Sequence, residues 1–266
     1  MPSAENIQPD SRFLGLFIGR SGSGKSAAAY SFPHPIKVLD LDGRIRGGLV
    51  PWVERKGIDY DYFPPKDKTT VFQRLNDSFA ALDVMLRTSV GVPYKTLVLD
   101  SITWEVIDLL LDAIPLTHAP SNQGERGRTL GTLQMAGPED YKFQSTGTYQ
   151  TIAYLKTLPI PNIIVTAHIV NKFAKDKNDK YGPNVIVGEQ LSLTDKLAEN
   201  VPSSFDNVFR FEKEDTGSAV KFFFEAQGEL ARNALNIHYG KFEITGKDFY
   251  KEMMRLAGVK GETTNA

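Results

Sequence analysis

The sequence of 266 residues contains no cysteine. This excludes structural disulfides, cysteine-rich zinc sites and thiol catalysis, and it suits a reducing cytoplasm. Long apolar runs are also missing, since no stretch reaches the roughly 18 residues that a membrane helix requires. The polar N-terminus, MPSAENIQPDSR, lacks the apolar core of a signal peptide. We therefore expect a soluble cytoplasmic protein with no membrane partner.

The sequence also has no large excess of charge of one sign. Lysine and arginine number 31 against 32 aspartate and glutamate, a formal net charge of -1. Contacts with nucleic acid would therefore depend on local basic patches and not on the global charge. The sequence shows no internal repeat, and its 41% hydrophobic and 24% charged residues are typical of a globular protein. A chain of this length can bury a stable core without disulfides.

Short apolar runs alternate with helical patterns over the first 170 residues. This alternation predicts an α/β fold with a mostly parallel central sheet flanked by helices. Strands are expected at 13–18, 36–42, 58–63, 95–101 and 162–170, and helices at 27–32, 70–88, 102–114 and 139–158. The last hundred residues predict antiparallel strands at 206–213 and 218–227, a hairpin around a lysine-rich turn, and a helix near 247–257. We expect a single domain over 12–258, with flexible ends at 1–11 and 259–266.

Eight consecutive residues, GRSGSGKS from Gly19 to Ser26, match the pattern G-x-x-x-x-G-K-[ST]. Glycines let the backbone curl so that successive N–H groups point at phosphate oxygens, and the helix that follows adds its positive N-terminal end. Lys25 can reach the β and γ phosphates, and the Ser26 hydroxyl can bind Mg²⁺. The predicted nucleotide-binding residues are Gly19, Arg20, Ser21, Gly22, Ser23, Gly24, Lys25, Ser26 and Ala27.

A chain of this composition meets that pattern by chance about one time in a hundred. Here the pattern also follows an apolar strand and opens a helix, which is the context that a phosphate-binding loop requires. The sequence therefore predicts binding of a nucleoside triphosphate, ATP with Mg²⁺, although no motif that would distinguish ATP from GTP is evident.

Polar residues follow three of the predicted strands, where ligands bind in open α/β sheets. Asp100 is predicted to hold Mg²⁺, with a helix N-cap as the alternative. Asp40 or Asp42 could orient the attacking water, unless both are acids of a solvated turn. His168 could sense the γ-phosphate, or be a partly buried histidine with a structural partner.

The order and spacing of these residues resemble the RecA-like branch of P-loop ATPases, within it the phage-encoded nucleotide-binding proteins related to single-strand annealing recombinases. The resemblance covers approximately residues 12–245. In recombinases a strand ends in Asp-x-Glu-Gly, and the Glu activates water. Asp42 takes that position in Asp40-Leu41-Asp42-Gly43, with a side chain one methylene shorter, which leaves the hydrolysis rate open. Asp100-Ser101 matches the metal strand, and Ala167-His168 replaces the usual Asn-Gln of the sensor strand. The resemblance thus implies Lys25, Asp42, Asp100 and His168 as catalytic residues.

The resemblance also implies two loops that contact single-stranded DNA. The first is the loop at 115–137, with Arg126 and Arg128. The second is the lysine-rich hairpin at 171–182, with Lys172, Lys175, Lys177 and Lys180. Each could equally be a solvated loop, because a charge cluster alone is weak evidence and Asp176 and Asp179 dilute the second one.

RecA-like proteins complete each active site with a basic residue from the next subunit, so a homo-oligomer, a ring or a filament, is implied. Arg232 is the main candidate for that residue, ahead of Lys221, and a surface cation is the alternative for both. The resemblance implies that a phage-encoded protein of this group would work in the host cytoplasm, with a single-strand binding protein as a further partner.

These observations predict a Mg²⁺-dependent ATPase that acts on single-stranded DNA in recombination, annealing or replication. The alternative is a nucleotide-dependent switch or assembly protein that acts on protein partners and never binds DNA, which the neutral charge favours. A third hypothesis, a nucleoside or nucleotide kinase, lacks a convincing lid with paired arginines, although Arg126 and Arg128 leave it open.

Overall fold

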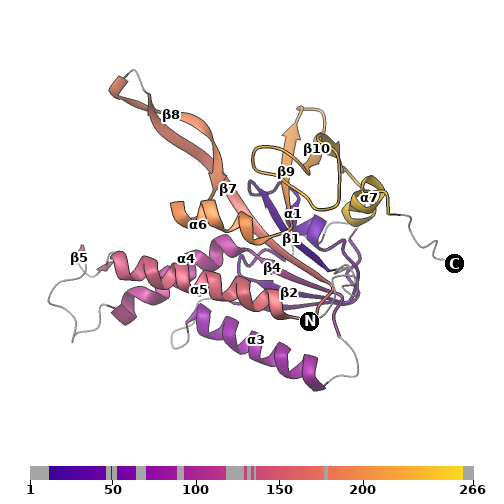
Figure 1. Ribbon diagram of the computed structural model, residues 1–266, viewed down its shortest axis with the longest axis horizontal. Helices are drawn as coiled ribbons and strands as arrows, with labels where there is room; N and C mark the ends of the chain where they lie inside the picture. The colour runs from indigo at the N-terminus through magenta and orange to yellow at the C-terminus, as the bar shows by residue number, and fades with distance from the viewer. Residues whose placement is uncertain are drawn as a thin grey trace, which may run out of the picture.

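A computed structural model describes residues 12–45, 49, 53–63, 70–88, 93–117, 129–130, 133–134, 136–176 and 179–259. Within these residues the main sheet has nine strands in the order β11-β10-β9-β1-β7-β4-β2-β3, with β8 paired to β7 (Figure 1). The strands are β1 (Phe13–Gly19), β2 (Ile36–Asp40), β3 (Ile58–Tyr62), β4 (Thr96–Asp100), β7 (Asn162–Asp176), β8 (Asp179–Leu191), β9 (Asn207–Asp215), β10 (Val220–Glu225) and β11 (Lys241–Glu243).

The six strands from β9 to β3 in this order run parallel, and β8, β10 and β11 pair antiparallel to their neighbours. All residues of β1 and β4 are buried. This explains their continuous apolar sequences, because a parallel strand in the centre of a sheet is covered on both faces. The mostly parallel sheet with antiparallel C-terminal strands confirms the predicted fold class.

Two hydrophobic cores lie on opposite faces of the sheet, and alternate residues of β1 enter each of them. Leu16 and Ile18 join the core beneath α3 (Val71–Thr88), α4 (Ile102–Thr117) and α5 (Pro138–Thr157). Phe17 joins the core beneath α1 (Lys25–Ala29) and α7 (Phe249–Leu256), where its ring packs edge-on against Phe249. The period-two alternation of a strand therefore divides one apolar run between both layers.

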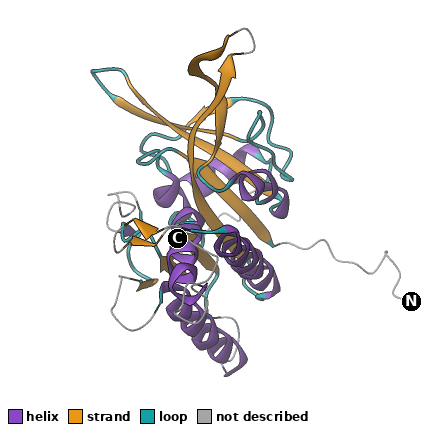
Figure 2. Cartoon of the chain, turned by 90° about the vertical axis from the view of Figure 1, so that its left-hand side faces the viewer, coloured by secondary structure: helices purple, strands orange, loops and turns teal. Residues whose placement is uncertain are grey.

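β7 extends past the edge of the sheet and pairs with β8 as a two-stranded hairpin, here called the β7–β8 ribbon (residues 169–176 and 179–191). Figures 1 and 2 show it projecting from the same end of the molecule as the β9–β10 hairpin. The predicted hairpin is confirmed, but most of the lysine-rich segment predicted as its turn, KFAKDKNDKYGP, belongs to its strands. A ribbon with both faces open to water tolerates polar residues that would be excluded from a covered strand.

Three further elements lie outside the predicted pattern: α6 (Asp195–Asn200), a 3-10 helix (Pro202–Ser204) and the short strand β11. In the predicted loop at 115–137, α4 continues to Thr117, and β5 (Thr129–Leu130) pairs with β6 (Leu133–Gln134). Arg126, Arg128, the predicted flexible end at 1–11 and all but Val259 of the predicted flexible end at 259–266 lie outside the described residues. None of the helices in the described part of the chain is long and apolar enough to cross a membrane.

Candidate functional site

The phosphate-binding loop connects β1 to α1, and three of its glycines are required by its geometry. Gly22 and Gly24 have φ angles of 75° and 94°, which residues with side chains rarely adopt. A Cβ on Gly19 would lie 2.4 Å from the carbonyl oxygen of Phe211 on β9. The glycines of the motif therefore serve both the curl of the loop and its close approach to the neighbouring strand.

Lys25 is buried at the start of α1, and its Nζ donates to the carbonyl oxygens of Gly19 and Arg20, each at 2.9 Å. Burial lowers the pKa of Lys25 to about 8, although the carboxylates of Asp100 and Asp42 oppose this shift. The amine is thus held by its own loop, in a place where phosphate oxygens could take over from the two carbonyls.

The predicted magnesium pair is brought together across the sheet. The Ser26 hydroxyl donates to Oδ2 of Asp100 at 2.7 Å, and Tyr30 donates to the same oxygen at 3.2 Å. Thr166 on β7 donates to Oδ1 of Asp100. A hydroxyl and a carboxylate at the mouth of a phosphate loop are oxygen ligands of the kind that Mg²⁺ prefers, so these residues fit that ion.

The two acids after β2 have different surroundings. Asp40 is 1% exposed and accepts hydrogen bonds from the backbone N–H groups of Arg44 and Ile45, at 3.2 and 3.1 Å. Burial raises the pKa of the Asp40 carboxyl, and these backbone hydrogen bonds oppose the shift. Asp40 therefore stabilises the turn that follows β2, whereas Asp42 reaches the cavity.

Asp42 and His168 meet at this cavity. Nε2 of His168 lies 3.3 Å from Oδ2 of Asp42, and the His168 backbone N–H donates to Thr103 at 2.9 Å. Arg44 lies 3.3 Å from Asp42 and also donates to the Ser21 hydroxyl of the phosphate loop at 2.9 Å. The sequence analysis missed Arg44, which lies two residues after Asp42 in the segment GRIRGG.

The cavity has a volume of about 270 Å³ and joins these groups in one space. Beside the phosphate loop, its polar lining includes Asp42, Arg44, Asp100 and His168, and its apolar lining includes Phe222, Ile244 and Phe249. The lining residues are Ser21, Gly22, Ser23, Gly24, Lys25, Ser26, Ala27, Ala28, Asp42, Arg44, Asp100, His168, Phe222, Ile244, Lys247 and Phe249.

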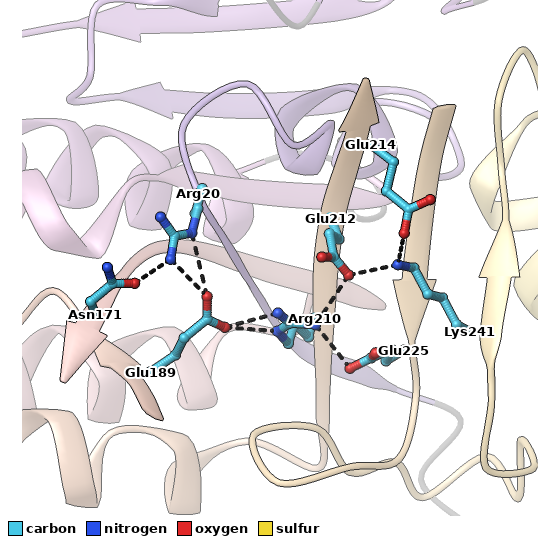
Figure 3. Close-up of polar contacts among 8 residues, drawn as sticks. All are labelled: Arg20, Asn171, Glu189, Arg210, Glu212, Glu214, Glu225 and Lys241. Carbon is cyan, nitrogen blue, oxygen red and sulfur yellow. Dashed lines mark hydrogen bonds and ion pairs between the residues drawn. The ribbon is translucent and has the colours of Figure 1, made fainter. Parts of the chain in front are cut away.

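Arg20, the second residue of the phosphate loop, is absent from the cavity lining and points toward Glu189 and Asn171 of the β7–β8 ribbon (Figure 3). It donates to Oε1 of Glu189 on β8 at 3.0 Å and to the Asn171 side chain on β7. Oε2 of Glu189 accepts from Arg210 on β9 at 2.8 Å. Burial alone would raise the pKa of Glu189, but the two guanidinium groups lower it below its usual value. A single carboxylate therefore joins the phosphate loop, the ribbon and β9.

Of the predicted trans-acting and DNA-contact residues, those that the structure describes with their side chains, Arg232, Lys221, Lys172 and Lys175, lie outside the cavity lining. Arg232 donates to the carbonyl oxygens of Pro202 and Phe205, and Lys221 pairs with Glu243 at 3.2 Å. Lys172 and Lys175 are exposed on the β7–β8 ribbon. Lys177 and the side chain of Lys180 lie outside the described residues. The roles predicted for these residues stay predictions.

The model of a family described as AAA domain, AAA_24, matches residues 14–234. The chain belongs to this AAA domain family. Membership implies a nucleotide-binding P-loop NTPase, in agreement with the loop, the strand ends and the cavity that this AAA domain presents.

Solved structures similar to this AAA domain protein include two archaeal proteins. The KaiC-like protein PH0186 from the hyperthermophile Pyrococcus horikoshii OT3 is 14% identical, with 90% of this chain and 87% of that chain covered and a TM-score of 0.44. The flagellar accessory protein FlaH from Methanocaldococcus jannaschii is 12% identical, with coverage of 89% and 86% and a TM-score of 0.36. A search of the curated proteins found no match.

Proposed function

We propose that this AAA domain protein hydrolyses ATP with Mg²⁺ and uses its nucleotide state to change how the β7–β8 ribbon contacts single-stranded DNA. The observation that carries the ATPase is the convergence of Lys25, Ser26, Asp42, Asp100 and His168, from four separate segments, on one cavity. Predicted separately from the ends of different elements, these side chains lie together as an NTPase site requires.

In this mechanism Lys25 and the loop N–H groups hold the triphosphate, and Ser26 and Asp100 would hold Mg²⁺, which neutralises charge on the phosphates when bound. Asp42 is the acceptor for the proton of the attacking water, and its contacts with His168 and Arg44 fix the orientation of its carboxylate. Arg44 also offers a cation beside the phosphate loop. His168 reports on the γ-phosphate through its contact with Asp42.

Two contacts support transmission from the site to the β7–β8 ribbon. The ribbon begins directly after His168, the residue that contacts Asp42. The Arg20–Glu189 contact joins the other strand of the ribbon to the phosphate loop. A shift of His168 on nucleotide binding would reach the ribbon through continuous backbone. A shift of Arg20 would reach it through the side chain of Glu189.

The exposed Lys172 and Lys175 support DNA as the partner, because cations on a projecting ribbon can contact phosphates. A second candidate function rests on a different observation. Phe173, Ile186 and Val187 are 57%, 60% and 52% exposed on the same ribbon. Exposed apolar side chains of this size favour a protein partner, so the switch that acts on proteins is the alternative.

ATP hydrolysis measured with and without single-stranded DNA, over a range of salt concentrations, tests the proposal. Stimulation by DNA that weakens steeply with salt and is lost in Lys25→Ala would support the DNA-directed ATPase. Turnover that DNA does not change, but that Lys25→Ala abolishes, would support the protein-directed switch. Turnover that persists in Lys25→Ala would overturn the phosphate site itself.

Self-assembly is part of the same proposal. Arg232 or Lys221 would complete the site of a neighbouring copy in a ring or filament, and a single-strand binding protein would be a further partner. Sedimentation with and without ATP and Mg²⁺ measures the assembly state. A protein that stays monomeric during turnover would remove the trans-acting role from both residues.

A further inference from the structure

The cavity at the phosphate loop has an apolar wall that the proposed mechanism does not use. Its wall consists of Phe222 on β10, Ile244 after β11, Lys247, and Phe249 on α7. Ile244 and Phe249 are 7% and 1% exposed. The ring of Phe222 lies 3.3 Å from the place where a Cβ on Gly24 would be. The wall therefore touches the phosphate loop where α1 begins.

We infer that this wall holds the base and ribose of the bound nucleotide by apolar contact, and that it accepts ATP and GTP with similar affinity. The inference rests on the proposed nucleotide site, and it names residues and a specificity that neither the loop motif nor the AAA domain family assigns.

Contacts of the phosphate loop indicate the direction of the nucleotide. Ser26 donates to Asp100 and Arg44 donates to Ser21, so a metal and the γ-phosphate belong on this acidic side of the loop. Phe222 lies against Gly24, at the start of α1. A triphosphate held by the loop with its γ-phosphate beside the acids would extend its nucleoside toward Phe222 and Ile244. A planar base gains from contact with an aromatic ring whatever its edge pattern.

The polar groups of this wall do not distinguish adenine from guanine. Adenine and guanine differ in the donors and acceptors of their edges, and strong discrimination requires a protein group that is left unpaired by the wrong base. Among the described residues that form the wall, only Lys247 has a polar side chain, and its Nζ donates to the Glu243 carbonyl at 3.0 Å. We therefore expect affinities for ATP and GTP that agree within about tenfold, since no matched pair of hydrogen bonds selects either base.

Calorimetric titration with ATP, GTP and inorganic tripolyphosphate tests both parts of the inference. Tripolyphosphate occupies the phosphate loop but has no nucleoside. Phe222→Ala should lower the affinities for ATP and GTP by about tenfold or more, because aromatic stacking on the base is lost. The affinity for tripolyphosphate should stay unchanged. Phe222→Leu, which keeps an apolar side chain and more of the packing, should give a smaller loss in the same direction.

Phe223→Ala is the matched control. Phe223 is the next residue of β10, lies outside the cavity lining and has the Lys241 ammonium 4.7 Å from its ring centre. Its replacement should leave all three affinities unchanged. Thermal melts of each variant show whether the fold is intact.

Three outcomes would overturn the inference. Phe222→Ala could keep its ATP affinity, or its affinity for tripolyphosphate could fall as much as that for ATP. The native protein could also prefer one purine nucleotide by more than a hundredfold. Failure of the phosphate site is distinct, because Lys25→Ala would then keep its affinity for all three ligands.

Discussion

Lys25 has an ammonium group in an environment that disfavours charge. It is 5% exposed, and burial lowers its pKa to about 8 in spite of the nearby carboxylates of Asp100 and Asp42. A lysine on the protein surface would stay charged to about pH 10, so its affinity for phosphate would not change near neutral pH. Here the charge that attracts the triphosphate is lost within the range of ordinary buffers.

ATP affinity is therefore expected to fall as pH rises. Well below pH 8 the amine is charged and affinity is constant, at pH 8 about half of the free protein has a neutral amine, and at pH 9 about nine tenths has one, so that affinity is about tenfold lower. Calorimetry from pH 7.5 to 9.5, a range in which the phosphates of ATP are already ionised, measures this. In Lys25→Arg, whose guanidinium stays charged, any affinity that remains should be independent of pH. A flat profile in the native protein would contradict the lowered pKa.

Asp42 should separate binding from chemistry. Asp42→Asn removes a proton acceptor but keeps the size of the side chain, so ATP affinity should change by less than about threefold while turnover falls by about a hundredfold or more. Measurements of binding and of phosphate release on the same preparation give both values. Undiminished turnover would remove Asp42 from its role.

Local sequence was enough to predict the phosphate loop, because its eight residues are contiguous and lie between an apolar strand and a helix. It could not choose between Asp40 and Asp42, since both lie at a strand end. Their different surroundings arise from the turn at Arg44 and Ile45, whose backbone N–H groups donate hydrogen bonds to Asp40. Phe222 follows the loop by about two hundred residues and has no signature of its own, so only the fold reveals it.

At the scale of elements, periodic patterns predicted the long helices and the buried strands well. The errors concern the projecting ribbon and short elements. The lysines of the β7–β8 ribbon resemble a turn, and α6 has only six residues. The place of β7 between β1 and β4 also has no local signal, because strand order is a property of the whole sheet.

The β7–β8 ribbon should respond to ATP through Glu189. Because the chain has no cysteine, Phe173→Cys creates a unique attachment point for an environment-sensitive fluorophore on the ribbon. ATP should change its emission, and Glu189→Gln should reduce that change severalfold, since the charge that pairs with Arg20 is removed.

Glu225→Gln makes the same change of charge on a residue that contacts Arg210 but not Arg20. It should keep the response to ATP. Equal loss in both variants would assign the effect to the charge network in general, and no loss in Glu189→Gln would exclude this route to the ribbon.

The stability of the whole molecule should depend on a carboxyl group that has no part in the site. Glu105 on α4 is 2% exposed, and burial raises its pKa to about 8. The unfolded chain would release that proton near pH 4.5, the ordinary value. The folded state thus binds an extra proton between these values, and the free energy of unfolding falls as pH rises toward 8.

Denaturant titrations at pH 6.5 and 8 should show this loss, up to about 1.4 kcal/mol per pH unit. The nearby Asp108, whose pKa burial raises to about 6, contributes mainly below this range. Glu105→Gln has no proton to lose and should remove the slope. The same slope in the variant would show that another group causes it.

The position of β7 also has a consequence for the order in which the protein matures. The phosphate loop and Asp100 both precede β7 in the sequence, yet β1 and β4 are not neighbours in the sheet. Each pairs with β7, which begins at Asn162. A nascent chain that ends before this strand holds the recognisable motif without the site. Closure of the sheet depends on contacts between distant parts of the sequence, which form slowly. Nucleotide binds only the completed site, so it would stabilise the folded state relative to chains in which β7 has not yet paired. The ligand would then promote folding as well as serve as a substrate.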